Sequence, residues 1–202
     1  MRNKPVQQKT ILLKELFRKL IHLCSAVIPF LLDRFYWQVI IALFFVVCLF
    51  VLSEIIRLEG FKVPLISKIT EFASRERDEN KIVLGPISLV FGIITAAILL
   101  PYEAMRVGIY ALAFGDGLAS LVGKMFGKTK IPFTNGKTIA GSLACFCAVI
   151  LSTFYVSKNL IISFIIALFA MLVEMLPLED LDNIVIPISI GGIYYLIQTC
   201  IR

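Results

Sequence analysis

The chain contains a series of apolar segments long enough to cross a lipid bilayer, and these segments limit the folds open to it. A hydrocarbon core of about 30 Å needs about 20 apolar residues per helix. Six runs approach or reach that length: 35–56, 82–100, 105–123, 139–156, 160–176 and 184–201. A seventh run, 20–32, is shorter and becomes long enough only when it joins the amphipathic segment 11–19.

These runs predict the fold class. Hydrophobic residues make up 59% of the chain and its mean hydropathy is +0.91, values too high for a soluble domain. Only helices and closed barrels can span a membrane, because every backbone polar group must be satisfied within the protein. We expect an all-α, polytopic transmembrane helical bundle of about seven spans with an N-terminal amphipathic segment.

We expect a single integral membrane domain over residues 1–202, with no internal repeat. Residues 1–19 form a basic interfacial segment. The connection 57–81 is expected to contain a helix lying in the membrane plane, because one helical face of it is apolar. The residues of that face are Leu65, Ile66, Ile69, Phe72 and Ala73.

The distribution of basic residues predicts the orientation. Sixteen Lys and Arg residues precede the first span or lie between spans two and three or four and five, whereas the other side holds only Arg34, Arg106, Lys158 and Arg202. The positive-inside rule then places the N-terminus and the basic connections in the cytoplasm and the C-terminus on the opposite side. Anionic membrane lipids are natural partners of such flanks. Nucleic acid is not, because the aromatic residues lie in the spans without interleaved Arg or Lys.

Asp116 lies within the apolar span 105–123. A carboxylate there costs roughly 2.5–3.5 kcal/mol on insertion scales, so it is expected to have a partner or a function. Gly115, Ala119 and Gly123 repeat every four residues around it, a spacing that favours close approach of another helix.

A basic, glycine-containing connection follows this span. Lys124, Lys128 and Lys137 supply positive charge, and Asn135, Thr138, Gly141 and Ser142 surround the start of the next helix, where anions commonly bind. Lysines that only set the topology are the alternative. A P-loop is excluded, because Ile131 occupies the position of its first glycine.

Two further segments carry charge near the predicted cytoplasmic face. Lys14, Arg18 and His22 recur every four residues, with Lys19 adjacent, and could bind a phosphate or a lipid headgroup; snorkelling of Lys and Arg is the alternative. The connection 177–187 has no Lys or Arg but contains Glu179, Asp180, Asp182 and Asn183, whose oxygens suit Mg²⁺; ordinary loop acids are the alternative.

Two other features have simpler interpretations. Glu54 and Arg57, at i and i+3, are explained by an ion pair within one helix. The five cysteines lie in apolar runs without metal-ligand spacing and are expected to be free thiols.

Four motifs together resemble the polyprenol kinase family, which includes phytol and farnesol kinases, dolichol kinase and the CTP-dependent diacylglycerol kinase. They are Arg18-Lys19-x-x-His22, the run from Gly115-Asp116-Gly117 to Gly127, Asn135-x-Lys137-Thr138-x-x-Gly141-Ser142, and Glu174-x-x-Pro177 followed by Asp182-Asn183. One departure is that Leu181 precedes Asp182, whereas related kinases often have two consecutive acids there.

The resemblance implies a CTP-dependent lipid alcohol kinase that phosphorylates an isoprenoid alcohol or diacylglycerol at the cytoplasmic face, with CTP as phosphoryl donor and Mg²⁺ as cofactor. The implied catalytic residues are Asp116, Glu174 and His22. The implied metal ligands are Asp116, Asp180, Asp182 and Asn183. The implied nucleotide-binding residues are Arg18, Lys19, Lys124, Lys128, Asn135, Lys137, Thr138, Gly141 and Ser142.

Two alternatives stay open at this point. A phosphatidate cytidylyltransferase making CDP-diacylglycerol shares the segment from the Asp to the Gly-Lys, although its C-terminal signature is absent here. An ion- or proton-coupled transporter would use Asp116 and Glu174 as carriers, although the inverted halves common in transporters are missing. The oligomeric state is open, a homodimer included.

Overall fold

The computed structural model describes residues 4–61 and 81–201, with side chains from residue 12 onward, and this part of the chain contains no β-strand. The all-α prediction is therefore confirmed. The in-plane helix expected within 57–81 falls largely on residues outside the described ranges. The described elements are α1 Lys4–Cys24, η1 Ser25–Val27 (a 3₁₀ turn), α2 Ile28–Leu58, α4 Leu84–Leu99, α5 Tyr102–Tyr110, η3 Ala111–Asp116 (π-helical), α6 Gly117–Phe126, α7 Ile139–Ser157, α8 Leu160–Met175 and α9 Asp182–Ile201.

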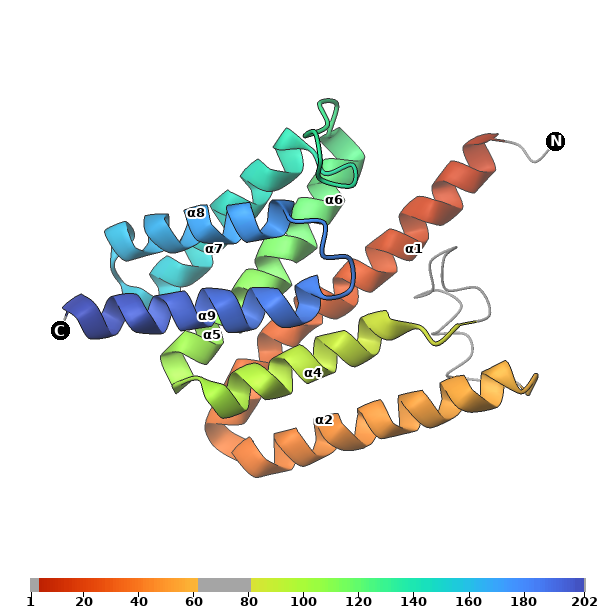
Figure 1. The fold of residues 1–202 in the computed structure, drawn as a ribbon, viewed down its shortest axis with the longest axis horizontal. Helices are drawn as coiled ribbons and strands as arrows, with labels where there is room; N and C mark the ends of the chain where they lie inside the picture. Colours follow the sequence, from red (N-terminus) through yellow and green to blue (C-terminus); the bar gives the residue numbers. More distant parts are fainter. Residues whose placement is uncertain (1–3, 62–80, 202) are drawn as a thin grey trace.

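The chain reverses direction inside the segment assigned to α2. Phe35 has non-helical angles, φ −137° and ψ 54°, so α1, η1 and the start of α2 form one rod and the rest of α2 forms a second. Figure 1 shows the two rods meeting in a sharp bend at one end of the molecule. The prediction that 11–19 and 20–32 belong to one helix agrees with this arrangement.

The predicted apolar runs coincide with helices, but the helices differ in length. Four stretches are long and apolar enough to cross a membrane: Leu12–Leu58, which includes the bend, Tyr102–Phe126, Ile139–Ser157 and Asp182–Ile201. Helices α4 and α8 are apolar but have 16 residues each, about 24 Å at 1.5 Å per residue. They are shorter than the hydrocarbon core of about 30 Å.

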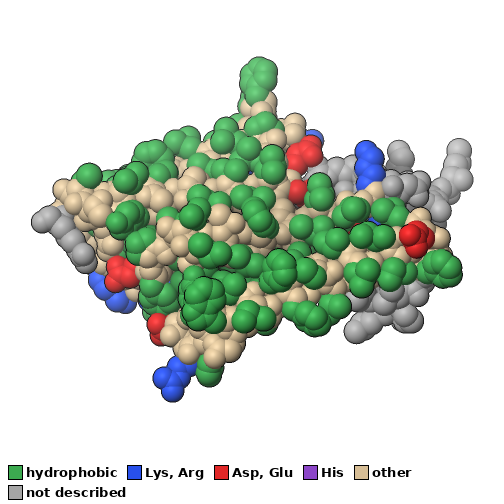
Figure 2. Space-filling model, turned by 60° about the horizontal axis from the view of Figure 1, so that its bottom comes forward, with side chains coloured by type: hydrophobic (Ala, Val, Ile, Leu, Met, Phe, Trp, Pro, Cys, Tyr) green, Lys and Arg blue, Asp and Glu red, His purple; other side chains and the backbone are tan. Residues whose placement is uncertain are grey.

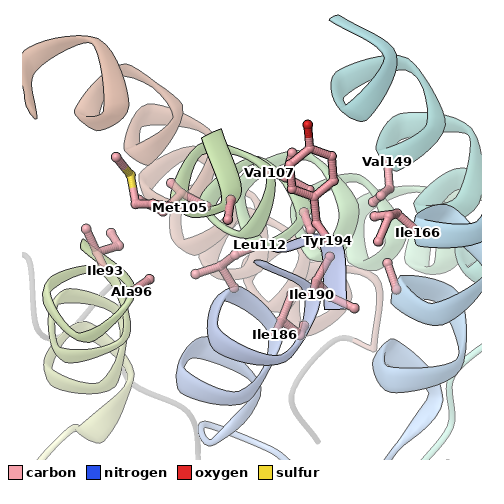
Figure 3. Close-up of a cluster of buried hydrophobic side chains, with 14 of the residues drawn as sticks. Ile93, Ala96, Met105, Val107, Leu112, Val149, Ile166, Ile186, Ile190 and Tyr194 are labelled. Carbon is pink, nitrogen blue, oxygen red and sulfur yellow. The ribbon is translucent and has the colours of Figure 1, made fainter. Parts of the chain in front are cut away.

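The core lies where the rod formed by α5, η3 and α6 meets α9 and α7. Figure 3 shows Leu112 of η3 facing Ile186 and Ile190 of α9, with Val149 of α7 and Ile166 of α8 nearby. All five side chains are almost fully buried. These contacts fix α5, η3 and α6 at the centre, with α1 crossing beside them and α4, α7, α8 and α9 around them (Figure 1).

The outer surface of the bundle is hydrophobic. Phe44 and Phe45 of α2, Leu151 of α7 and Ile161 of α8 are all more than half exposed. Figure 2 shows hydrophobic side chains over much of one face, with few charged side chains among them. A surface of this kind suits contact with lipid chains.

Close packing of α9 against α4 depends on a glycine. A Cβ placed on Gly92 would lie 2.0 Å from the backbone oxygen of Asn183, and backbone cannot move aside as a flexible side chain can. Gly92→Ala is therefore expected to destabilise the protein by about 1–3 kcal/mol, the usual range for overpacking. Thermal unfolding in detergent measures the effect.

Gly192→Ala is the matched control, because no atom lies within 4 Å of a Cβ at that position of α9. Equal unfolding temperatures for the two variants would contradict the packing of α4 on α9.

Candidate functional site

Asp116 is buried in an ion pair between distant helices. It is 4% exposed, and its Oδ2 lies 2.5 Å from Lys19 Nζ of α1 and 3.4 Å from His22 Nδ1. Asp116 is the last residue of the π-helical segment η3, and π-helical turns are frequent at functional sites. The buried carboxylate thus has the partner that its burial requires, supplied by two of the predicted site residues.

Glu15 is not among the site residues predicted from the sequence. It contacts the charged groups of Arg18 and Lys124. It is 3% exposed and forms an ion pair with Arg18, accepts a hydrogen bond from Ser120, and lies 2.6 Å from Lys124 Nζ. Glu15, Arg18, Lys19 and His22 stand at i, i+3, i+4 and i+7, so they share one face of α1. That spacing is the signal by which Glu15 could have been found.

A cavity joins the cationic face of α1 to the acidic residues at the start of α9. It is lined by Arg18, Lys19 and His22 on one side and by Asp180, Asp182 and Asn183 on the other. Gly85 and Pro86, at the start of α4, complete the polar end of the wall. Three segments far apart in the sequence therefore meet at one place, which we call the charged cavity.

Asn183 presents an acceptor oxygen at the charged cavity. Its Nδ2 donates to the backbone oxygen of Gly85 at 3.2 Å and to Ser88 Oγ at 2.8 Å. A carbonyl only accepts hydrogen bonds, so the amide NH₂ must face Gly85. The buried Oδ1 then has no hydrogen-bond partner within the described residues.

This arrangement fits a hard divalent cation. Mg²⁺ takes oxygen ligands and is commonly held by one or two carboxylates together with phosphate oxygens. Asn183 Oδ1 and the carboxylates of Asp180 and Asp182 supply such oxygens along one wall. The described part of the chain has no cluster of three or more His, Cys, Asp or Glu suited to a metal, so water and phosphate oxygens would complete the coordination.

A second polar group lies between α7 and α8. Lys137 Nζ lies 3.0 Å from Glu174 Oε1 and also donates to the backbone oxygen of Glu174. Ser142 Oγ donates to Glu174 Oε2 at 3.3 Å. Lys137, Ser142 and Glu174 are predicted site residues, and they therefore meet between α7 and α8. None of the three lines the charged cavity.

Of the other predicted nucleotide-binding residues, two are exposed and one packs between helices. Lys128 and Asn135 are exposed, and Asn135 has φ +50° in the loop before α7. Gly141 packs against α6, because a Cβ there would lie 2.6 Å from the backbone oxygen of Ala119. The close helix approach predicted for Gly115, Ala119 and Gly123 is thus present. So is the ion pair of Glu54 with Arg57, at 2.8 Å.

Thr138 caps α7. Its buried hydroxyl accepts a hydrogen bond from the backbone N–H of Gly141 at 3.2 Å. Thr138→Ala is expected to lower the unfolding free energy by about 1 kcal/mol, the usual cost of losing such a cap. Thr138→Ser keeps the hydroxyl and is the control. If thermal unfolding in detergent shows no difference between the two variants, the hydroxyl does not stabilise α7.

Comparisons with known proteins find relatives over most of the chain. An uncharacterised protein of Methanocaldococcus jannaschii is 30% identical over 189 residues, which cover 90% of this chain and 93% of that protein. The chloroplastic phytol kinase 1 of Arabidopsis thaliana is 24% identical over 206 residues, and the chloroplastic farnesol kinase of the same plant is 32% identical over 127 residues. The chain is thus related to proteins named phytol kinase and farnesol kinase, which supports a relationship to the polyprenol kinase family.

The similarity does not extend over the full length of the plant proteins. The alignments cover 66% of the phytol kinase and 41% of the farnesol kinase, so the chain spans about two thirds or less of these relatives. No protein-family model matches the chain, and no solved structure matches it significantly.

The four motifs that resemble polyprenol kinases are distributed over two places. The α1 motif and the Asp182-Asn183 motif line the charged cavity. Asp116 is connected to the cavity because it forms an ion pair with Lys19, which lines it. The Lys137 and Glu174 motifs meet at the α7–α8 group.

Proposed function

We propose that the chain is a lipid alcohol kinase that transfers the terminal phosphoryl group of a nucleoside triphosphate to an isoprenoid alcohol, with CTP as donor and Mg²⁺ as cofactor. The observation that carries the proposal is the charged cavity, where the cations of α1 face the side-chain oxygens at the start of α9. Phosphoryl transfer needs mainly positioning and charge stabilisation, and cations facing metal-binding oxygens supply both. Kinase activity in relatives named phytol and farnesol kinase supports the same reaction class.

The residues divide into three roles in this proposal. Arg18 and Lys19 bind phosphate oxygens, and Lys124 and Lys137 add positive charge nearby. Asp182 and Asn183 hold Mg²⁺, which neutralises phosphate charge when bound. Asp116 accepts the proton of the acceptor hydroxyl, with His22 beside it.

The reaction balances with these roles. The oxygen of the alcohol forms a bond to the terminal phosphorus, and the bond from that phosphorus to the bridging oxygen breaks. The nucleoside diphosphate leaves with the electron pair of that bond. The hydroxyl proton passes to a carboxylate, for which Asp116 is the candidate and Glu174 the alternative.

We also propose that all seven apolar segments cross the membrane, with the N-terminus and the charged cavity at the cytoplasmic face and the C-terminus opposite. The basic residues of α1 and of the connection after α6 favour this orientation. Helices α4 and α8 have few residues for a full crossing. Local thinning of the bilayer offsets a mismatch of this size at a modest cost.

The test uses the purified protein in detergent with Mg²⁺, each of CTP, ATP and UTP labelled in the terminal phosphate, and farnesol, phytol, diacylglycerol and phosphatidate as acceptors. Labelled prenyl phosphate, formed best with CTP, is the expected product. Absence of any phosphorylated alcohol would overturn the proposal. Pyrophosphate release with formation of a CDP-lipid from phosphatidate would identify a cytidylyltransferase. Ion flux into liposomes without nucleotide would identify a transporter.

A further inference from the structure

Arg106 is a partly buried cation in α5 that the proposed reaction does not use. It precedes Asp116 on the same rod by roughly 15 Å along the helix axis. Figure 1 shows α5 at the same end of the molecule as the bend between the first two rods. An arginine within an apolar segment is costly and is expected to have a partner.

Four aromatic rings surround the Arg106 guanidinium. They belong to Phe30, Tyr102, Tyr110 and Tyr155, and their centres lie 5.3–6.0 Å from the central carbon of the guanidinium. Such contacts stabilise the positive charge through the faces of the rings. They leave the N–H groups at the edge of the guanidinium in need of hydrogen-bond acceptors, because an arginine has donors only.

The described part of the chain does not supply an anion for Arg106. Its Nε is buried without a hydrogen-bond partner there, and so is the hydroxyl of Tyr110. Asp33 and Glu103 are exposed acids of α2 and α5, and neither forms an ion pair with Arg106 within the described ranges. Buried donors are normally paired, so the acceptor is expected to come from a bound molecule.

A second cation meets one of the same rings. Lys158 Nζ, in the turn after α7, lies 4.8 Å from the centre of the Tyr155 ring, and the Arg106 guanidinium lies 5.8 Å from it. Two positive charges at one ring repel each other. An anion that contacts both would remove this repulsion.

An apolar groove opens beside these two cations. Its volume is about 530 Å³, within the range of sites that hold small molecules, and its lining residues are all uncharged. Phe30, Tyr110 and Tyr155 line the groove and also surround Arg106. From Tyr155 the lining follows α7 to Ala148, roughly 10 Å along the helix axis. The groove therefore begins at the cations and continues as an apolar surface.

We propose that this surface binds an anionic phospholipid, with the headgroup phosphate on Arg106 and Lys158 and one acyl chain in the groove. A guanidinium binds a phosphate through parallel N–H···O bonds, which uses the unpaired donor of Arg106. Two cations without an acid favour a headgroup with net negative charge over a zwitterionic one. The site is separate from the charged cavity and takes no part in the proposed phosphoryl transfer.

Thermal unfolding of the purified protein in a neutral detergent, without nucleotide, Mg²⁺ or alcohol, tests the inference. Dioleoylphosphatidylglycerol is expected to raise the unfolding temperature by about 5 °C or more at a lipid concentration about a hundredfold above Kd. Dioleoylphosphatidylcholine has the same chains and is expected to raise it much less. Equal shifts with the two lipids would mean contact with bulk lipid only and would overturn the inference.

Two variants test the headgroup contacts. Arg106→Gln and Lys158→Gln are each expected to weaken phosphatidylglycerol binding about tenfold, measured as the lipid concentration at half of the temperature shift. Lys158 is exposed, so its variant is expected to fold even if Arg106→Gln does not. Arg34→Gln removes an exposed arginine near the start of α2 and is the control. The same lipid affinity in Lys158→Gln as in the unmodified protein, with no loss in Arg106→Gln, would contradict the headgroup site.

A pair of variants in α7 tests the groove. Ala148 lines it, whereas Cys147 is exposed and is not part of its lining. Ala148→Phe is expected to weaken phosphatidylglycerol binding about tenfold with both cations intact, and Cys147→Phe is expected to leave it unchanged. Inorganic phosphate serves as the probe for the cations alone. If phosphate alone shifts the unfolding temperature, and Arg106→Gln removes that shift while Ala148→Phe leaves lipid binding intact, the site binds a soluble anion and the lipid assignment is wrong.

Discussion

Replacing Asp116 by Asn is expected to lower phosphoryl transfer to the lipid alcohol by about 10²- to 10⁴-fold, the usual effect of losing a group that transfers a proton in the transition state. Asn has nearly the same shape as Asp but cannot accept the hydroxyl proton. The rate is measured with saturating nucleotide and farnesol in detergent. Gel filtration and the unfolding temperature show whether the variant is folded.

Asp33→Asn is the matched control, because the same change is made at an exposed aspartate near the start of α2. It is expected to keep full activity. If a folded Asp116→Asn variant phosphorylates farnesol at the unmodified rate, Asp116 is not the proton acceptor, and Glu174 becomes the carboxylate to test.

Replacing Lys19 by Met is expected to destabilise the protein by about 3–5 kcal/mol, the usual cost of removing one partner from a buried ion pair. The change leaves the Asp116 carboxylate buried without its cation at 2.5 Å. The unfolding free energy in detergent measures the loss. Lys128→Met changes an exposed lysine and is expected to stay within about 0.5 kcal/mol.

The double variant Lys19→Met with Asp116→Asn isolates the ion pair. It removes both charges, so it is expected to be more stable than Lys19→Met alone, with a coupling energy of about 0.5–3 kcal/mol. It is also expected to be inactive. Losses that simply add would contradict a direct interaction between the two side chains.

Much of the fold could be predicted because apolar runs and helices have the same physical cause. In a bilayer, a continuous apolar segment must satisfy its own backbone hydrogen bonds, so its position in the sequence gives the position of a helix. The break at Phe35 falls at the boundary expected between the first two spans. The π-helical turn η3 could not be predicted, because it depends on packing between α5, η3 and the surrounding helices.

The charged residues of the candidate site were more predictable than their pairing. The sequence predicts five site residues that the structure places around one cavity: Arg18, Lys19, His22, Asp182 and Asn183. Glu15 was missed because Ser120 and Lys124, two of its partners, lie more than 100 positions away. The sequence predicts Thr138 as an anion-binding residue, and the structure shows its hydroxyl capping α7. A capping hydroxyl and an anion-binding hydroxyl occupy the same position of a helix.

Lys19 contributes to two interactions at once, because its ammonium neutralises Asp116 and its side chain lines the charged cavity. An anion that binds this ammonium weakens its hold on the carboxylate, and the two equilibria are reciprocal. In the proposed reaction, a nucleotide that binds Lys19 would therefore make the Asp116 carboxylate more available to the hydroxyl proton. This coupling would favour ordered binding with the nucleotide first.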